Sequence, residues 1–377
     1  MSTTTTYLPP KKHYEILDGL RGVAAVTVVI FHVLETYSGD RFHQIINHGY
    51  LAVDFFFLLS GFVIAYAYDD RWAKMTQWDF YKRRLIRLQP MVILGTVIGA
   101  ALFYFQACGD FPLIAGTPVW KMLLVMLLGF TMLPLPVSMD IRGWAEMHPL
   151  DGPAWSLFFE YIGNILYAVI VRRFSKTLLA IFVVLSACFL VQFLVQPHTQ
   201  GDVIGGWALD KTQMHIGFAR LLFPFFGGVL LMRMGKLIRI KGAFTVCSVL
   251  LLVVLSVPRL GGTTEGLWMN GIYESVVIIL FFPLIVAIGA GGTMTRKSTQ
   301  KICTFLGGIS YPLYITHYPL IYLHKAWVMN NKIPMQTGLL GGLVVLIVAI
   351  TIAYASLKLY DEPVRKWLTD RFLKKQG

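Results

Sequence analysis

Charged residues are scarce in this sequence. Only 14% of its 377 residues are charged, whereas 56% are hydrophobic, and the mean hydropathy is +0.63. Soluble globular domains carry about 25% charged residues, so this composition excludes an ordinary soluble protein. Polar stretches are also too short to form a separate soluble core. We therefore expect one multi-pass membrane domain that covers residues 1–377.

Cysteine is also sparse. Cys108, Cys188, Cys247 and Cys303 are scattered along the chain, which excludes a disulfide framework and a cysteine-based metal site. The patterns GxxxxGKS/T, HExxH and CxxC are missing as well, so no motif predicts a metal. The basic excess, 33 Lys and Arg against 20 Asp and Glu, clusters beside apolar segments. This placement favours membrane orientation and anionic lipids over a nucleic acid partner.

Long apolar segments recur from end to end. A window of about 20 residues finds them at 16–37, 50–68, 89–107, 120–134, 154–171, 177–195, 216–234, 243–258, 271–291, 303–324 and 338–358. Basic loops should be cytoplasmic, which requires an even number of crossings between Arg87 and Arg172. Three segments lie there, so we expect the shortest, 120–134, not to cross.

These segments predict an all-α integral membrane protein. It should have about ten transmembrane helices plus one re-entrant or short helix, with both termini cytoplasmic. Residues 1–15 should be a cytoplasmic tail that is not removed as a signal peptide. Residues 359–377 should form a cytoplasmic amphipathic tail that lies on the inner leaflet without a catalytic duty.

Three ionisable residues interrupt the first apolar segment, LDGLRGVAAVTVVIFHV. The spacing of Asp18, Arg21 and His32 puts them on one face of a helix. Ionisable groups inside a membrane are costly and usually serve a reaction or a transport pathway. Histidine suits a base that takes a proton near neutral pH, so we predict that His32 is catalytic. Glu160 is the first candidate for a carboxylate that orients it, and Asp54 is the second, although either could serve helix packing or capping.

A cationic site is predicted at the cytoplasmic side. Arg84 and Arg87 are three residues apart, so they share a helix face, and guanidinium groups suit phosphates. Arg21 should lie at the same depth in the membrane. The three arginines together therefore favour a site for a phosphate-bearing ligand over a basic loop that only orients the protein in the membrane. Ser60 precedes Gly61 on the second segment, where small residues let either a helix or a ligand approach closely.

Five motifs resemble, in order, those of the membrane-bound acyltransferase 3 family. They are LDGLRGVAAVTVVIFHV, GYLAVDFFFLLSGFVIAY, FYKRRLIRLQP, PAWSLFFEYIGNILY and LGGISYPLYITHYPL, and the ending YDEPVRKW also fits. The resemblance implies transfer of an acyl group, usually acetyl, from cytoplasmic acyl-coenzyme A to a hydroxyl of a carbohydrate or related acceptor across the membrane. It also implies that His32 is catalytic and that Arg21, Arg84 and Arg87 serve the donor.

Further residues are candidates for the acceptor end of such a channel. They are Ser310, Tyr314 and His317, which share a helix face, and Trp155 and Ser156, which begin the segment that carries Glu160. Anchoring of aromatic residues at the membrane interface explains several of them equally well. Some members of the family carry an appended esterase-like domain. Because the sequence ends at Gly377, we expect none here.

Two other hypotheses use the same residues. A transporter or flippase for an anionic or glycosidic solute could use Arg21, His32 and Glu160 without chemistry, although no internal repeat is evident. Alternatively, His32 could carry the acyl group covalently in a two-step reaction. The expected location is the plasma membrane, the inner membrane of a bacterium.

Overall fold

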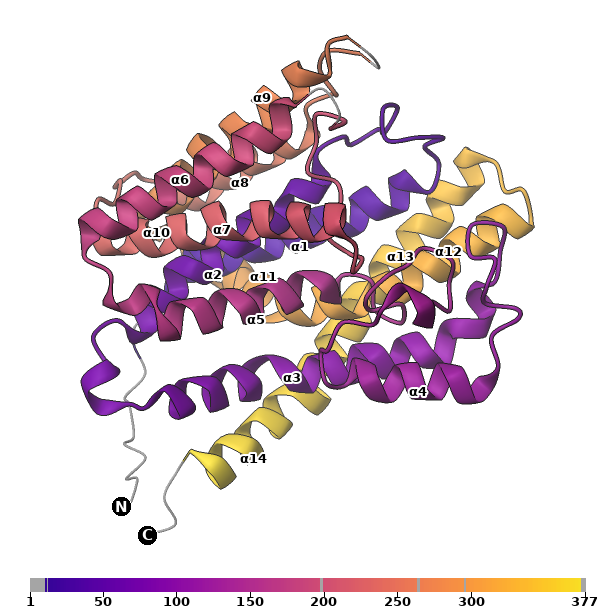
Figure 1. Ribbon diagram of the computed structural model, residues 1–377, viewed down its shortest axis with the longest axis horizontal. Helices are drawn as coiled ribbons and strands as arrows, with labels where there is room; N and C mark the ends of the chain where they lie inside the picture. The colour runs from indigo at the N-terminus through magenta and orange to yellow at the C-terminus, as the bar shows by residue number, and fades with distance from the viewer. Residues whose placement is uncertain (1–10, 12, 197–198, 263–264, 295, 374–377) are drawn as a thin grey trace.

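The computed structural model describes residue 11 and residues 13–196, 199–262, 265–294 and 296–373. Over these residues the fold is a bundle of helices with two isolated β-bridges and no β-strand (Figure 1). The all-α prediction is therefore confirmed. The parts of the predicted tails at 1–10, 12 and 374–377 lie outside the described residues.

The helices coincide with the apolar segments of the sequence. They are α1 (Glu15–Glu35), α2 (Ala52–Tyr68), α3 (Gln77–Leu102), α4 (Val119–Gly129), α5 (Ala154–Val169), α6 (Lys176–Val195), α7 (Lys211–Met234), α8 (Ala243–Ser256), α9 (Leu267–Val276), α10 (Phe282–Gly291), α11 (Lys297–Thr316), α12 (Tyr318–Asn330), α13 (Met335–Ser356) and α14 (Glu362–Phe372).

Seven helical runs in the described residues are long and apolar enough to cross a membrane. They contain α1, α2, α3, α6, α7, α9 with α10, and α13 with α14. Helices α5, α8 and α11 were also predicted to cross, but they are shorter or less apolar. The chain is thus a multi-helix membrane protein, while ten crossings and cytoplasmic termini stay predictions.

The segment 120–134 contains only the 11-residue helix α4. At about 1.5 Å per residue this helix is about 16 Å long, and the hydrocarbon core of a bilayer is about 30 Å thick. Helix α4 packs beside α3 and is followed by an irregular stretch through 130–153 (Figure 1). A helix of this length does not span a bilayer, in line with the non-crossing segment that the basic loops predict.

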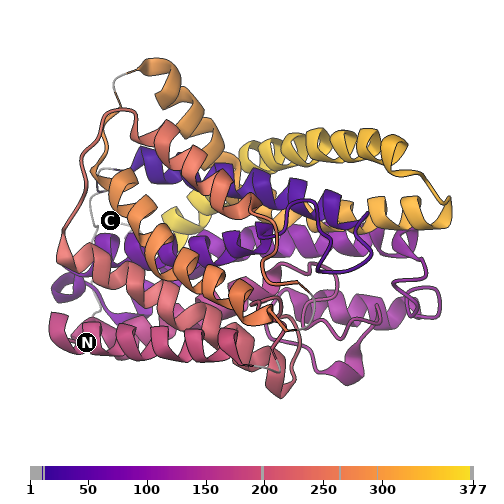
Figure 2. The ribbon, with the colours of Figure 1, turned by 90° about the horizontal axis from the view of Figure 1, so that it is seen from above.

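The last two apolar segments differ from the prediction. The segment 303–324 is divided between α11 and α12, which meet at a bend at His317. Pro319 favours a new first helical turn there because it has no N–H to donate. After α12 the chain turns back into α13, which lies beside α12 at one edge of the bundle (Figure 2). Helix α13 then continues through a π-helical turn, Leu357–Asp361, into α14.

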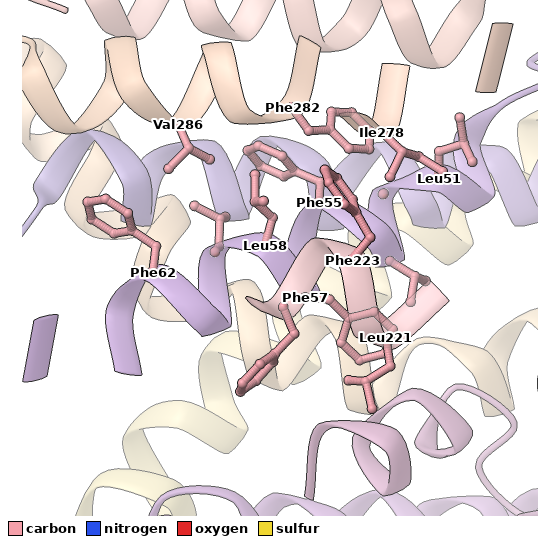
Figure 3. Close-up of a cluster of buried hydrophobic side chains, with 14 of the residues drawn as sticks. Leu51, Phe55, Phe57, Leu58, Phe62, Leu221, Phe223, Ile278, Phe282 and Val286 are labelled. Carbon is pink, nitrogen blue, oxygen red and sulfur yellow. The ribbon is translucent and has the colours of Figure 1, made fainter. Parts of the chain in front are cut away.

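The core is built around the contact between α2 and α7. Apolar side chains of α2 interleave with those of α7 and of the run 277–291 (Figure 3). The two backbones touch because both helices have a glycine at the contact. A methyl group on Gly61 would lie 1.7 Å from the carbonyl oxygen of Phe225, and one on Gly228 would lie 2.1 Å from that of Leu58. Gly61 therefore serves helix packing.

We expect Gly61→Ala to destabilise the protein by at least about 2 kcal/mol, because the methyl group must push two backbones apart. Thermal unfolding in detergent measures the effect. Gly227→Ala is the matched control, since its methyl group would have no neighbour nearer than 3.7 Å, and it should unfold at or above the wild-type temperature. Equal stability of Gly61→Ala and wild type would contradict this account of the contact.

Candidate active site

A histidine and a glutamate form a pair near the end of α1. The Nδ1 atom of His32 lies 2.8 Å from Oε2 of Glu35. The two residues are three positions apart in the sequence, so they are neighbours on one helix face. Because a carboxylate accepts hydrogen bonds, Nδ1 carries the proton and donates it to Glu35. The Nε2 atom of His32 is then left as a base.

Aromatic rings hold the imidazole of His32 from other sides. The ring of Tyr318 meets it edge-on at 4.7 Å between centroids, and the ring of His317 stacks against it at 5.7 Å. His317 is fully buried, and its Nδ1 donates to the carbonyl oxygen of Tyr314 at 2.9 Å. Since His317 lies at the bend between α11 and α12, this bend brings a second histidine next to His32.

The two predicted carboxylate partners of His32 lie elsewhere. Glu160 accepts hydrogen bonds from Ser60 and from Arg84, each at 2.6 Å, and Asp54 is bound to Arg220. Glu160 lies on α5, and its carboxylate points to α2 and α3, where Ser60 and Arg84 bind it, and not to His32 on α1. Glu35 was missed, although its spacing of three residues from His32 in the sequence was a usable signal.

A cavity of about 460 Å³ lies where α1, α2, α3, α5, α11 and α14 converge. We call it the basic cavity, because five arginines line it: Arg21, Arg83, Arg84, Arg87 and Arg365. Ser60, Ser156, Ser310, Asp18 and Glu160 line it as well. All four residues predicted to bind a donor, Arg21, Arg84, Arg87 and Ser60, therefore share one cavity.

Most of these cations have a single carboxylate partner. Arg21 donates to Asp18 at 3.1 Å, and Arg84 donates to Glu160. Arg87, in contrast, has neither a hydrogen bond nor an ion pair within the described part of the chain, and its exposed side chain lines the cavity. The cavity thus has more positive than negative charge and can hold an anion such as a phosphate.

A second, smaller cavity of about 120 Å³ contains His32 and Glu35. We call it the histidine cavity. Several of its other lining residues are aromatic or charged, among them Phe31, Tyr50, Trp144, Trp155, Trp207, Tyr318, Glu146 and Arg220. Trp144, Glu146 and Trp207 come from irregular stretches, which an isolated β-bridge joins at Glu146 and Ala208. Sequence reasoning missed these three residues because no helical or strand periodicity marks them.

Glu146 is a second acidic residue, besides Glu35, that lines the histidine cavity. It lies in the irregular stretch 130–153, is 5% exposed, and accepts a hydrogen bond from Tyr322 at 2.6 Å. Burial raises the pKa of Glu146 to about 7, and the nearby guanidinium of Arg142 acts against this rise. Near neutral pH its carboxyl group can therefore donate or accept a hydrogen bond.

The two cavities meet at Val53 and Tyr314, which line both. The hydroxyl groups of Tyr314 and Ser156 are hydrogen-bonded at 2.8 Å, and the ring of Phe56 lies edge-on to that of Tyr314. Of the residues predicted for an acceptor, Trp155 lines the histidine cavity, Tyr314 lines both cavities, and Ser156 and Ser310 line the basic cavity. His317 packs behind His32.

Arg220 fixes the wall of the histidine cavity through a buried ion pair. Its Nη2 donates to Oδ2 of Asp54 at 2.7 Å and to the carbonyl oxygen of Tyr50 at 2.7 Å. Its guanidinium also lies 5.1 Å from the ring of Trp155, close enough for a cation–π contact. Asp54 therefore positions Arg220 and Trp155 and is not bonded to His32.

We expect Arg220→Ala to destabilise the protein by about 3–5 kcal/mol, because it leaves the buried Asp54 carboxylate unpaired. Adding Asp54→Asn should restore part of the loss, since the second change removes the buried charge. Thermal unfolding of the single and double variants tests this, with Arg239→Ala, an exposed arginine, as control. A single variant as stable as wild type would disprove the role of the pair.

A membrane-embedded helical fold, a cationic cavity and a histidine–carboxylate pair are together the elements expected of a membrane-bound acyltransferase. Residues 14–358 match the family described as Acyltransferase domain. The chain therefore belongs to the acyltransferase 3 family, as its five motifs predict.

Two relatives illustrate the family. The chain is 34% identical over 170 residues to Protein 2 in picA locus of Rhizobium radiobacter. The aligned region covers 42% of this chain and 83% of that protein. It is 21% identical over 369 residues to O-acetyltransferase OatA of Staphylococcus aureus, and that aligned region covers 93% of this chain and 57% of OatA. The chain thus spans little more than half the length of OatA. No solved structure matches the chain.

Proposed function

We propose that this protein is an integral membrane O-acyltransferase of a bacterial plasma membrane. It moves an acyl group, which we take to be acetyl, from cytoplasmic acyl-coenzyme A to a hydroxyl of a carbohydrate acceptor at the outer side of the membrane. One observation carries the proposal: a cavity with unpaired positive charge meets a cavity with a histidine–glutamate pair at Val53 and Tyr314. Donor phosphates and a reacting hydroxyl can thus approach one point from opposite directions.

The basic cavity suits the nucleotide end of the donor. Its arginines provide planar donor groups for phosphate oxygens, and Arg87 has no protein anion that a phosphate would have to displace. Arg21 and His32 are eleven residues apart on α1, which is about 16 Å along a helix. The extended pantetheine arm of coenzyme A has a comparable length, so phosphates near Arg21 leave the thioester near His32.

The chemistry at His32 is a direct acyl transfer. The acceptor oxygen attacks the thioester carbonyl carbon, so that a C–O bond forms and the C–S bond breaks. Nε2 of His32 takes the hydroxyl proton during the attack and then gives it to the departing thiolate sulfur, which leaves as coenzyme A thiol. The negative charge of Glu35 holds the ring in this orientation and stabilises the imidazolium formed between the two proton transfers.

The side assignments come from the sequence and the cavity walls. Basic loops favour the cytoplasmic side, and the basic cavity includes Arg83, Arg84 and Arg87 at the start of α3. The histidine cavity would then face outward. Its tryptophans, Trp144, Trp155 and Trp207, offer flat apolar faces to the C–H side of a sugar ring. Arg220 and Glu146 offer polar partners for its hydroxyl groups.

We expect His32→Ala to lower release of coenzyme A thiol from acetyl-coenzyme A by at least about 100-fold, the usual scale for loss of a general base. Purified protein in nanodiscs and a thiol-reactive dye measure the release. Isothermal titration with coenzyme A should still detect binding, because the basic cavity is intact.

His43→Ala is the matched control, since His43 is exposed in a loop and paired with Asp40. It should behave as wild type. Full turnover by His32→Ala would remove His32 from the reaction. A wild-type protein that neither binds coenzyme A nor releases thiol would disprove the acyltransferase proposal.

We expect Glu35→Gln to lower thiol release by about 10- to 100-fold, taking as a guide the loss seen when the hydrogen-bond partner of a metal-binding histidine is removed. The amide keeps the size of the side chain and can still accept the Nδ1–H hydrogen bond, but it lacks the charge that stabilises imidazolium. The affinity for coenzyme A should not change. A turnover rate equal to that of wild type would show that Glu35 only packs against His32.

A further inference from the structure

The C-terminal helix α14 forms part of the wall of the basic cavity. Arg365, Thr369 and Leu373 line the cavity, and their spacing of four residues places them on one helix face. This differs from the tail on the inner leaflet without catalytic duty that the sequence predicts. Helix α13 continues through a π-helical turn into α14, and this continuation carries the three residues to the cavity.

The π-helical turn fixes the direction of Arg365. Asp361 ends this turn, its side chain is 1% exposed, and its Oδ2 accepts a hydrogen bond from Nη1 of Arg365 at 2.9 Å. Helix α14 also packs against α3, which carries Arg83, Arg84 and Arg87. The ion pair with Asp361 therefore holds the Arg365 guanidinium at the cavity instead of letting it extend into solvent.

The charges of this cluster do not cancel. Arg21, Arg84 and Arg365 each have one carboxylate partner, Asp18, Glu160 and Asp361 respectively. Arg83 and Arg87 have neither a hydrogen bond nor an ion pair among the residues that the structure describes. Arg365, Arg21 and Arg84 are close enough to Arg87 to repel its guanidinium, whereas Asp361, which is bonded to Arg365, attracts it more weakly.

Such an arrangement is stable when an anion lies between the guanidinium groups. Two guanidinium groups that approach from different helices can each donate two hydrogen bonds to one phosphate. Arg87 comes from α3 and Arg365 from α14, so the two approach the cavity from different elements. The pairing of Arg365 with Asp361 engages one edge of its guanidinium and leaves its remaining N–H groups to donate elsewhere.

We propose that Arg365, together with Arg87, binds a phosphate of the acyl-coenzyme A donor, and that α14 is one wall of the donor site. Asp361 acts as a positioning residue for Arg365. This inference rests on the proposed function, since it takes coenzyme A as the ligand of the basic cavity.

The test compares two donors that differ in their phosphates. Acetyl-coenzyme A has them, whereas acetyl-pantetheine has the same thioester and arm without any phosphate. We expect Arg365→Ala to lower kcat/KM for thiol release at least tenfold with acetyl-coenzyme A and to leave kcat/KM with acetyl-pantetheine unchanged. Arg365→Lys should recover part of the loss because it keeps a positive charge.

Two controls separate binding from folding. Arg371→Ala changes an exposed arginine of the same helix that does not line the cavity, and it should not change either rate. Because Arg365→Ala leaves the buried Asp361 unpaired, the double variant with Asp361→Asn removes both charges. It should fold and show the same selective loss with acetyl-coenzyme A.

The possible failures are distinguishable. Equal losses with both donors, or no loss with either, would overturn the role of Arg365 while wild-type turnover upholds the proposed function. A loss that disappears in nanodiscs of phosphatidylcholine alone would assign Arg365 to an anionic lipid headgroup and overturn the proposal. If wild-type protein neither binds coenzyme A nor acts on either donor, the proposed function itself fails.

Discussion

Buried ion pairs between helices organise much of the structure. Removing a charge from water costs several kcal/mol unless an opposite charge lies beside it. Asp54 with Arg220 ties α2 to α7, and Glu160 with Arg84 ties α5 to α3. These are contacts between elements far apart in the sequence, so the charges fix which helices meet and where. The glycine contact at Gly61 then sets how closely α2 and α7 approach.

Hydropathy predicted the helices well because burial in lipid requires long apolar runs. The prediction from hydropathy failed where tertiary contacts determine how an apolar segment is divided or directed. The segment 303–324 was predicted to be a single crossing, yet Pro319 allows a bend at His317 that turns α12 away from α11. In the same way, the basic composition of 359–377 is typical of a surface tail, but the π-helical turn at Leu357–Asp361 redirects α14 toward α3.

The candidate site could be predicted in part. Arg21, Arg84 and Arg87 were expected to share a ligand, and they line one cavity. Helix periodicity places Arg84 and Arg87 on one face of α3, but it does not say which carboxylate on another helix will reach a given side chain, and binding of a ligand by these arginines stays a prediction. Glu160 was therefore assigned to the wrong neighbour, whereas Glu35, three residues from His32, needed only the geometry of one helix. The catalytic role of His32 stays a prediction.

The boundary between the two cavities limits which part of the proposed donor can pass from the basic cavity into the histidine cavity. Val53 and Tyr314 line both sides, and the hydrogen bond to Ser156 keeps the Tyr314 ring in place. The basic cavity, where we propose that the donor binds, has a volume of about 460 Å³, whereas the histidine cavity, proposed for the acyl group and the acceptor hydroxyl, has about 120 Å³. A long acyl chain would fill this space and exclude the hydroxyl. Within the proposed function, this difference in size favours a short acyl group such as acetyl, because a two-carbon group leaves room beside His32 for the nucleophile.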